Sequence, residues 1–352
     1  MHKLETLGWK DGLEVEKEKA ARVITVQKNS YRISDGEMDY LAHLSGKFLN
    51  EASSPLDFPA VGDWVEVQKL PEENKAVIKR IVPRTSQFVR QAAGERTDPQ
   101  IVAANIDIVF IVNSLNHDLN ARRIERYILL AYESGATPIV LLTKKDQVTE
   151  EEVRKAIATV SEVAIGVDIL TISSLTGDGL DELETYLSSG KTGALLGSSG
   201  VGKSTLINSL LGYEVQETKE IREDDSRGRH TTTHREMFML PNGAMIIDTP
   251  GMREIQMWDG ETAIEQTFQD VEVFASECKF TDCKHKTEPG CRIREAIETG
   301  ELTEKRFRSF IKLQREIAYE KRKQDQKAKL EEKSKWKKIS KYQKNIQKHN
   351  VK

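Results

Sequence analysis

The stretch GALLGSSGVGKSTLINSLL, residues 193–211, joins an apolar strand, a glycine-rich loop and a run of helical character. Its centre, Gly197–Ser204, fits the pattern G-x-x-x-x-G-K-[ST] in the strand–loop–helix context that the pattern requires. Backbone N–H groups of such a loop wrap a phosphate, and the helix N-terminus reinforces them. The predicted phosphate site comprises Gly197, Ser198, Ser199, Gly200, Val201, Gly202, Lys203, Ser204 and Thr205. Within it, we expect Lys203 to reach the β and γ phosphates and Ser204 to ligate Mg²⁺.

The next apolar strand, Ala244–Thr249, ends in the sequence Asp248-Thr249-Pro250-Gly251. An aspartate at the end of a strand can hold Mg²⁺ through water, and the amide of a following glycine can sense a γ phosphate. We assign these two roles to Asp248 and Gly251. The pattern D-x-x-G is common in ordinary turns, and its position after a buried strand is what makes it informative.

The segment between these two motifs is polar and rich in threonine, and Gly228–His234 reads GRHTTTH. A nucleotide switch offers a hydroxyl to Mg²⁺ from a loop of this kind. We expect Thr232 to supply it, although spacing does not separate Thr232 from Thr231. A threonine-rich strand edge would also explain the segment.

A base-recognition motif, Thr143-Lys144-Lys145-Asp146, follows the apolar run Thr137–Leu142. The Asp146 carboxylate can accept hydrogen bonds from N1–H and the exocyclic amine of guanine, a pair that adenine does not offer. The stem of Lys144 can lie across the base. A second loop, with Ser173 and Ser174, ends the next strand and would flank the base.

Two folding patterns divide the first 250 residues. Residues 20–83 contain short strand-like segments separated by turns, which indicates a small barrel. The expected strands are Ala21–Gln27, Ser30–Ser34, Met38–Leu44, Asp63–Gln68 and Ala76–Ile81. An oligonucleotide-binding barrel is the natural candidate, and a generic five-stranded barrel fits the pattern equally well. From about Ile101, buried strands alternate with helical segments, as in a parallel α/β sheet.

All three cysteines of the chain lie within 14 residues, in the arrangement Cys278-x4-Cys283-x-His285-x5-Cys291. Three thiolates and one imidazole form the tetrahedral set that a closed, structural zinc site uses. A knuckle this short has almost no core of its own, so we expect one structural Zn²⁺ to be needed for its folding. The alternative is three reduced surface cysteines.

The charge of the chain is distributed unevenly. Residues 303–352 contain 18 Lys and Arg against six Asp and Glu, a net +12, which leaves −15 for residues 1–302. A basic tail on an acidic body suggests a polyanionic partner such as nucleic acid, and a merely solvated tail is the alternative. No apolar run approaches the roughly 20 residues that span a bilayer, and no signal peptide is recognisable. We therefore expect a cytoplasmic protein that does not contact membranes.

The motifs TKKD, SSLT, GSSGVGKS, the threonine-rich switch and DTPG resemble those of the translation-factor-like GTPases, in the order of the circularly permuted GTPases. Permutation is tolerable because the sheet contacts are kept and the chain is reopened at a surface loop. A barrel before such a domain and a Cys3His knuckle after it resemble the family of small-subunit-dependent GTPases called RsgA or YjeQ, over residues 20–320.

The resemblance implies an oligonucleotide-binding barrel, GTP and GDP as ligands, binding to ribosomal RNA of the small (30S) subunit, and a late role in its maturation. It also implies that the subunit stimulates GTP hydrolysis, in a protein that we expect to be monomeric. The alternative is an RNA-binding protein that acts on another RNA. In that case GTP gates its affinity for the RNA, and the protein hydrolyses little GTP by itself.

Two positions depart from related patterns. Met252 stands where small GTPases of the usual motif order have a water-positioning glutamine, so hydrolysis must rely on another residue or a partner. We nominate His230 as the catalytic residue that orients water, with simple loop packing as the alternative. Gly200 stands where potassium-activated relatives have asparagine, so potassium dependence is not expected.

The chain is thus predicted to be a multidomain protein with four parts. These are an oligonucleotide-binding-like β-barrel over residues 1–97 and a circularly permuted α/β P-loop GTPase domain over 98–256, followed by a zinc-binding helical domain over 257–320 and a basic tail over 321–352.

Overall fold

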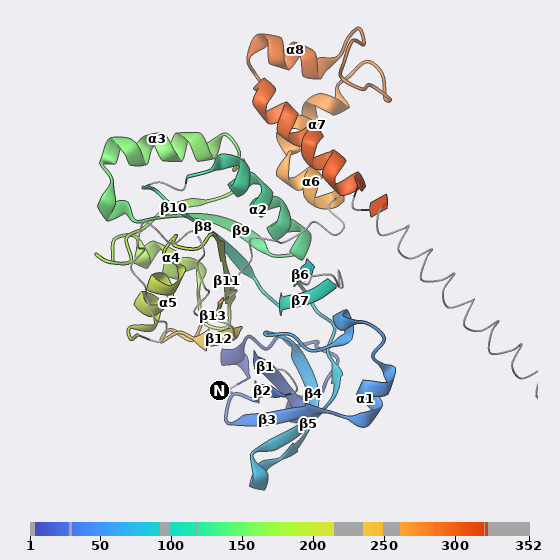
Figure 1. Cartoon of the computed structure of the whole chain (residues 1–352), viewed down its shortest axis with the longest axis vertical. Coiled ribbons are helices and arrows are strands. Elements are labelled where there is room, and N and C mark those ends of the chain that lie inside the picture. The colour runs from blue at the N-terminus through green and yellow to red at the C-terminus, as the bar shows by residue number, and fades with distance from the viewer. Residues whose placement is uncertain are drawn as a thin grey trace, which may run out of the picture. The chain divides into compact units, whose positions relative to one another are not determined.

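The computed structural model describes residues 4–27, 30–91, 99–116, 119–214, 235–248, 261–319 and 321–322. The chain divides into two compact units, unit 1 over Met1–Gln256 and unit 2 over Met257–Lys352 (Figure 1). Unit 1 contains a barrel and an α/β sheet, whereas the described part of unit 2 is helical.

The barrel is built from five strands in the order β1-β2-β3-β5-β4, and β4 pairs back with β1 to close it. Its elements are β1 (Ala20–Val26), β2 (Tyr31–Ser34), β3 (Asp39–Leu44), α1 (Gly46–Glu51), β4 (Trp64–Leu70) and β5 (Lys75–Ile81). Alternate residues of the strands fill its core, including Val23, Ile33 and Ile78, each fully buried. The predicted five-stranded barrel is confirmed, and its strand order is that of the oligonucleotide-binding fold.

A hairpin leads from the barrel into the α/β sheet. It consists of β6 (Gln87–Gln91) and β7 (Pro99–Ala104), which pair antiparallel as a separate two-stranded sheet. The expected domain boundary at 97/98 therefore falls between two paired strands.

The α/β sheet has the order β10-β9-β8-β11-β13-β12, parallel except for β12. Its strands are β8 (Ile108–Ser114), β9 (Thr137–Thr143), β10 (Ile169–Thr171), β11 (Thr192–Gly197), β12 (Glu236–Met239) and β13 (Met245–Asp248). Its helices are α2 (Ala121–Ser134), α3 (Glu150–Ser161), α4 (Leu180–Tyr186) and α5 (Lys203–Leu211). Because strand side chains alternate, Phe110 and Val112 of β8 join α4 and α5 in one core, while Val109 and Ile111 face the other side. The predicted α/β domain is confirmed.

The barrel and the sheet are continuous, because β12 pairs with β1 to give eleven strands in one sheet. Arg22 of β1 lies at this junction and is 1% exposed. Its guanidinium donates hydrogen bonds to the backbone carbonyls of Leu7, Gly62 and Asn105, and it lies 5.4 Å from the ring centroid of Trp64. Burial lowers the pKa of Arg22 to about 10, so it remains charged at neutral pH.

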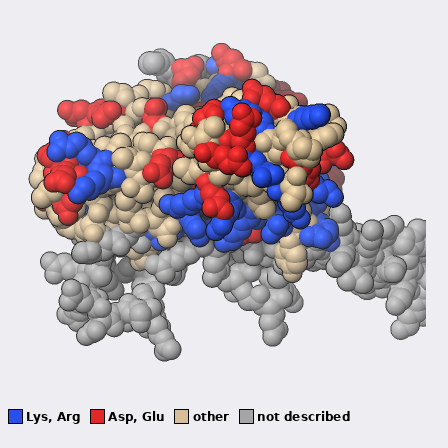
Figure 2. Space-filling model, turned by 90° about the horizontal axis from the view of Figure 1, so that it is seen from above, with Lys and Arg blue, Asp and Glu red and all other residues tan. Residues whose placement is uncertain are grey.

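The described part of unit 2 contains α6 (Glu261–Thr267), α7 (Gln269–Ser276), α8 (Arg292–Thr299) and a C-terminal helix over residues 304–319. Phe268 and Phe310 pack with ring centroids 5.4 Å apart. Buried Arg306 lies over Phe268 and pairs with Asp270 at 2.9 Å. On the face of the molecule in Figure 2, basic and acidic residues lie interspersed.

The described residues also include five short 3-10 turns. They lie at Glu5–Leu7, Lys17–Lys19, Pro55–Asp57, Pro71–Glu73 and Lys145–Gln147. Within the described residues, no helix is long and apolar enough to cross a membrane.

Candidate nucleotide site and metal centre

The glycine-rich loop lies between the end of β11 and the start of α5. A Cβ on Gly197 would lie 2.4 Å from the carbonyl oxygen of Val112 on the neighbouring strand, so glycine is required there. The loop turns through Gly200 and Gly202, whose φ angles of +81° and +96° are left-handed. The first helical residue is Lys203, so the N-terminus of α5, where backbone N–H groups point out of a helix, directly follows the loop.

The ammonium group of Lys203 folds back over the loop that precedes it. Its Nζ donates to the carbonyls of Gly197 at 2.8 Å and Ser198 at 2.6 Å. These contacts hold one positive charge at the mouth of the loop, where an anionic phosphate group would be attracted.

The two halves of the predicted nucleotide site are tied together by Thr143, the last residue of β9. Its hydroxyl lies 2.6 Å from the carbonyl oxygen of Val201 in the glycine-rich loop and 3.3 Å from that of Asn113. Thr143 is buried. The first residue of the TKKD motif therefore fixes the phosphate loop against the strand that leads to the base motif.

The base motif and the second base loop are joined by two side-chain contacts. The hydroxyl of Ser173 donates to Oδ1 of Asp146 at 2.6 Å, which orients the carboxylate. Lys145 forms an ion pair with Asp178 at 2.8 Å. Lys144 has a left-handed φ of +62°, and this turn lets the chain change direction between β9 and the 3-10 turn that carries Asp146.

Two supporting residues of this site were not predicted from the sequence. The hydroxyl of Ser209 on α5 contacts the carbonyl of Ser174 at 2.9 Å, so the helix after the phosphate loop supports the base loop. Asp178, the partner of Lys145, is the other. Asp178 lies in a Gly-Asp-Gly turn directly after the base loop, which is a signal that could have indicated it, whereas Ser209 has none.

The predicted magnesium ligands are only partly described. Asp248 is the last residue of β13, is 5% exposed and lies in register with Leu195 of β11, the strand that leads into the phosphate loop. This places its backbone at the same edge of the sheet as that loop. His230, Thr232 and Gly251 lie outside the described residues.

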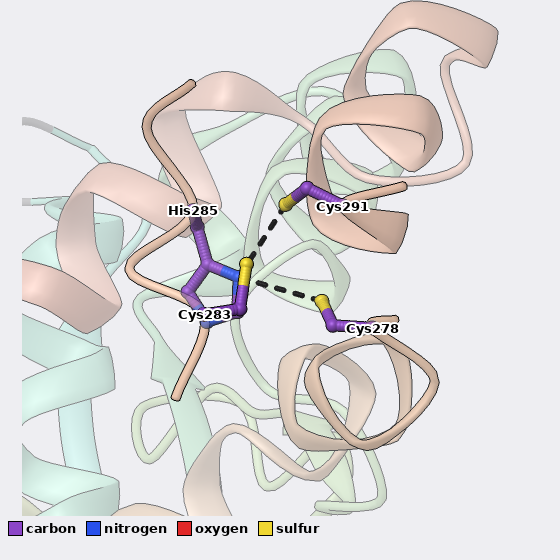
Figure 3. Close-up of side chains that lie close together, drawn as sticks. All are labelled: Cys278, Cys283, His285 and Cys291. Atoms are coloured by element: carbon purple, nitrogen blue, oxygen red, sulfur yellow. Dashed lines mark hydrogen bonds between the residues drawn. The ribbon is translucent and has the colours of Figure 1, made fainter. Parts of the chain in front are cut away.

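The four predicted metal ligands converge in unit 2 (Figure 3). Their ligand atoms all lie within 4.8 Å of one another. Cys278 follows α7, Cys291 precedes α8, and the Nδ1 atom of His285 lies 3.6 Å and 3.5 Å from their sulfur atoms. His285 adopts a left-handed φ of +56°, which turns the loop back toward the helices. This set of three sulfurs and one nitrogen fits a tetrahedral zinc ion and supplies a full set of protein ligands.

Two of the four ligands, Cys283 and His285, have shifted pKa values. Burial, followed by hydrogen bonds with the neighbouring thiols of Cys291 and Cys278, raises the pKa of Cys283 to about 11. Burial lowers the pKa of His285, which favours the neutral imidazole that ligates metal. Bound metal would supply the charge that stabilises the thiolates.

Several known proteins resemble this chain. The family model of the RsgA GTPase matches residues 81–258. The RsgA 2 small ribosomal subunit biogenesis GTPase of Lactiplantibacillus plantarum is 48% identical over 85% of this chain and 83% of its own length. RsgA 1 of Oceanobacillus iheyensis is 47% identical over 87% of each chain. A model of the ABC transporter family also matches residues 180–349, a stretch that contains the glycine-rich phosphate loop but not the base motif at 143–146.

Solved structures show the same architecture. YjeQ from Thermotoga maritima superposes with a TM-score of 0.63 at 27% identity, over 85% of this chain and 98% of its own. YloQ, described as a circularly permuted GTPase, superposes with a TM-score of 0.62 over 85% of this chain and 94% of its own, and its 24% identity supports the fold alone. The extent of these matches and the permuted order of the motifs show that the chain belongs to the RsgA GTPase family.

Proposed function

We propose that this protein binds GTP and hydrolyses it to GDP and phosphate during maturation of the small ribosomal subunit, and that the subunit stimulates the reaction. The observation that carries the nucleotide assignment is the contact between Ser173 and Asp146, since it aims a carboxylate as guanine recognition requires. The ribosomal setting rests on the relatives, which are named small ribosomal subunit biogenesis GTPases. We further infer a cytoplasmic monomer that binds ribosomal RNA.

Each predicted site residue has a separate role in binding or hydrolysis. Lys203 and the loop amides hold the phosphates, and the Asp146 carboxylate accepts hydrogen bonds from the guanine edge. Ser204, Thr232 and Asp248 would hold Mg²⁺, which neutralises phosphate charge when bound. The Gly251 amide senses the γ phosphate, and His230 orients the attacking water.

Slow intrinsic turnover is the expected consequence of Met252 at the position after the DTPG motif. Such a site needs a partner to complete it. Binding to the subunit would supply this completion, which couples phosphate release to the state of the partner.

The test is phosphate release from GTP by the full chain alone, with purified small subunits and with purified large subunits. A large rise with small subunits only is the expected result. Equal rates in all three mixtures would remove the ribosome from the proposal. A Lys203→Ala variant that binds RNA tightly and never releases it would favour gated RNA binding over hydrolysis as the main function.

A further inference from the structure

Unit 2 contains a groove beside the Cys3His cluster, between the loop at 284–286 and the C-terminal helix at 304–319. The groove encloses about 570 Å³. Its charged lining residues are five cations and one anion: Lys284, Lys286, Arg308, Lys312, Arg315 and Glu316. This excess of positive charge in a concave site favours an anionic partner.

Helical spacing gathers the cations of one wall. Arg308, Lys312, Arg315 and Tyr319 follow one another at three or four residues, which places them on one face of the helix. The opposite face is buried against unit 2, with Phe310, Leu313 and Ile317 all at most 6% exposed. The packing of one helix face thus fixes the charged face toward the groove.

The other wall is a loop that Glu288 holds in shape. Its carboxylate accepts hydrogen bonds from the backbone N–H groups of Lys284, Lys286 and Thr287 at 3.3, 2.8 and 3.0 Å. Hydrogen bonds from its own N–H and from these neighbours lower the pKa of Glu288 to about 2. The carboxylate is therefore ionised at neutral pH, and the loop presents its two lysine side chains to solvent.

The floor of the groove connects the loop to the helix. The His285 ring meets Phe307 edge-on, with centroids 5.9 Å apart, and Ile311 continues the apolar surface along the helix. His285 is also one of the four metal ligands. A bound metal would therefore fix the position of the ring that Phe307 of the helix contacts.

The cations of the groove are available to a partner. Within the described residues, no ion pair involves Lys284, Lys286 or Arg315. Arg308 and Lys312 pair with acidic side chains of their own helix, and all four groups of these pairs are at least 31% exposed. Exposed pairs of this kind contribute little and can be exchanged for phosphates.

An exposed aromatic ring distinguishes the class of partner. Tyr319 is 60% exposed and lines the groove together with Arg315 and Lys312. Proteins bind single-stranded nucleic acid with basic residues that track its phosphate backbone and with aromatic rings on which its bases stack. We infer that this groove binds single-stranded RNA, with phosphates on the basic residues and one base stacked on Tyr319. The inference rests on the proposed function for its ribosomal setting.

The test measures binding of zinc-loaded full chain to a fluorescent 12-nucleotide adenylate over a range of salt concentrations. The Lys284→Gln, Lys286→Gln, Arg315→Gln triple variant should bind more than tenfold more weakly, with a salt slope lower by about 2. Tyr319→Ala should cost about tenfold, and Tyr319→Phe should restore binding because it keeps the ring. The matched control changes Lys279, Arg294 and Lys305 to Gln, which removes the same charge from unit 2 outside the groove.

Three results would overturn the inference. The first is an equal loss in the control triple, which would mean general electrostatic attraction. The second is a Tyr319→Ala variant that binds the oligonucleotide as tightly as the wild type, together with tight binding of a polyglutamate peptide by the wild type. That result would indicate that the partner of the groove is an acidic protein. The third is unchanged RNA affinity in the triple variant of the groove, in a protein whose GTP hydrolysis small subunits still stimulate. That result would exclude the groove as the RNA site and leave the proposed function standing. A wild type that binds the oligonucleotide through the groove but is not stimulated by subunits would contradict only the proposed function.

Discussion

The nucleotide site in unit 1 and the metal centre in unit 2 reach their geometry by different routes. In unit 1, a parallel sheet with fully buried residues such as Phe110, Ile111 and Leu195 places the loops at the ends of its strands. In unit 2, the four ligands lie between short helices, and three of them remain partly exposed. The comparison indicates that a sheet core specifies the first site, whereas the second depends on a metal for much of its folding energy.

The largest expected effect tests that dependence. Removal of the metal by a chelator, or Cys291→Ser, should unfold unit 2, since structural zinc supplies about 10–16 kcal/mol in small domains. Unit 1 should keep its fold and its affinity for a fluorescent GDP analogue. Limited proteolysis and nucleotide binding, measured on one sample, check both halves. Protease resistance of unit 2 without metal would show that the helices suffice.

The next effect concerns the sheet-supported site. Asp146→Asn should weaken GDP binding by at least about 10³-fold, because the amide leaves guanine donors unpaired. The same variant should bind xanthosine diphosphate better than the wild type does, since its amide can donate to the xanthine carbonyl. Titration with both labelled nucleotides checks the exchange. If both affinities fell equally, the base would be read elsewhere.

The junction of barrel and sheet gives a smaller effect on stability. Arg22→Met leaves the carbonyls of Leu7, Gly62 and Asn105 without their buried donor, at a cost of about 3 kcal/mol or more in the free energy of unfolding. Arg80→Met is the control, because Arg80 is 44% exposed and pairs with Glu66 within the barrel. Urea unfolding monitored by tryptophan fluorescence measures the difference. Similar stabilities for the two variants would show that the junction is not what holds barrel and sheet together.

The smallest effect comes from Ser209→Ala, which removes the support of the base loop. Its one hydroxyl proton is shared between the carbonyls of Ser174 and Thr205, so a loss of about 1 kcal/mol, or fivefold in GDP affinity, is expected. Ser161→Ala is the control, because that hydroxyl contacts only a carbonyl of its own helix among the hydrogen bonds described. Equal GDP affinities for the two variants would show that the base loop holds its shape without α5.

The sequence predicted most of the architecture because each element has a local signal. All five barrel strands lie within two residues of their predicted bounds, since turn residues separate them. The hairpin of β6 and β7 was not predicted, and neither was β12, a four-residue strand that follows a long polar segment. The partner of β12 is β1, which is distant in the sequence, and polar residues separate β6 from β7. No local periodicity therefore indicates these three strands.

The candidate sites divide in the same way. Contiguous motifs indicated the phosphate loop, the base motif and the metal ligands directly. The contacts that support them, such as Thr143 with Val201 and Ser209 with Ser174, join residues 58 and 35 positions apart. Only the folded sheet brings those residues together, so spacing along the chain could not indicate them.

The pairing of β12 with β1 has a consequence for biosynthesis. A strand at the edge of a sheet presents unpaired N–H and C=O groups, which makes it a template for aggregation. Here the barrel strand β1 covers that edge at Thr25 and Glu236. Because domains fold from the N-terminus during synthesis, the barrel, whose last strand ends at Ile81, is complete about 155 residues before β12 begins at Glu236. The edge strand β12 of the α/β sheet therefore meets a finished partner within its own chain instead of a neighbouring polypeptide.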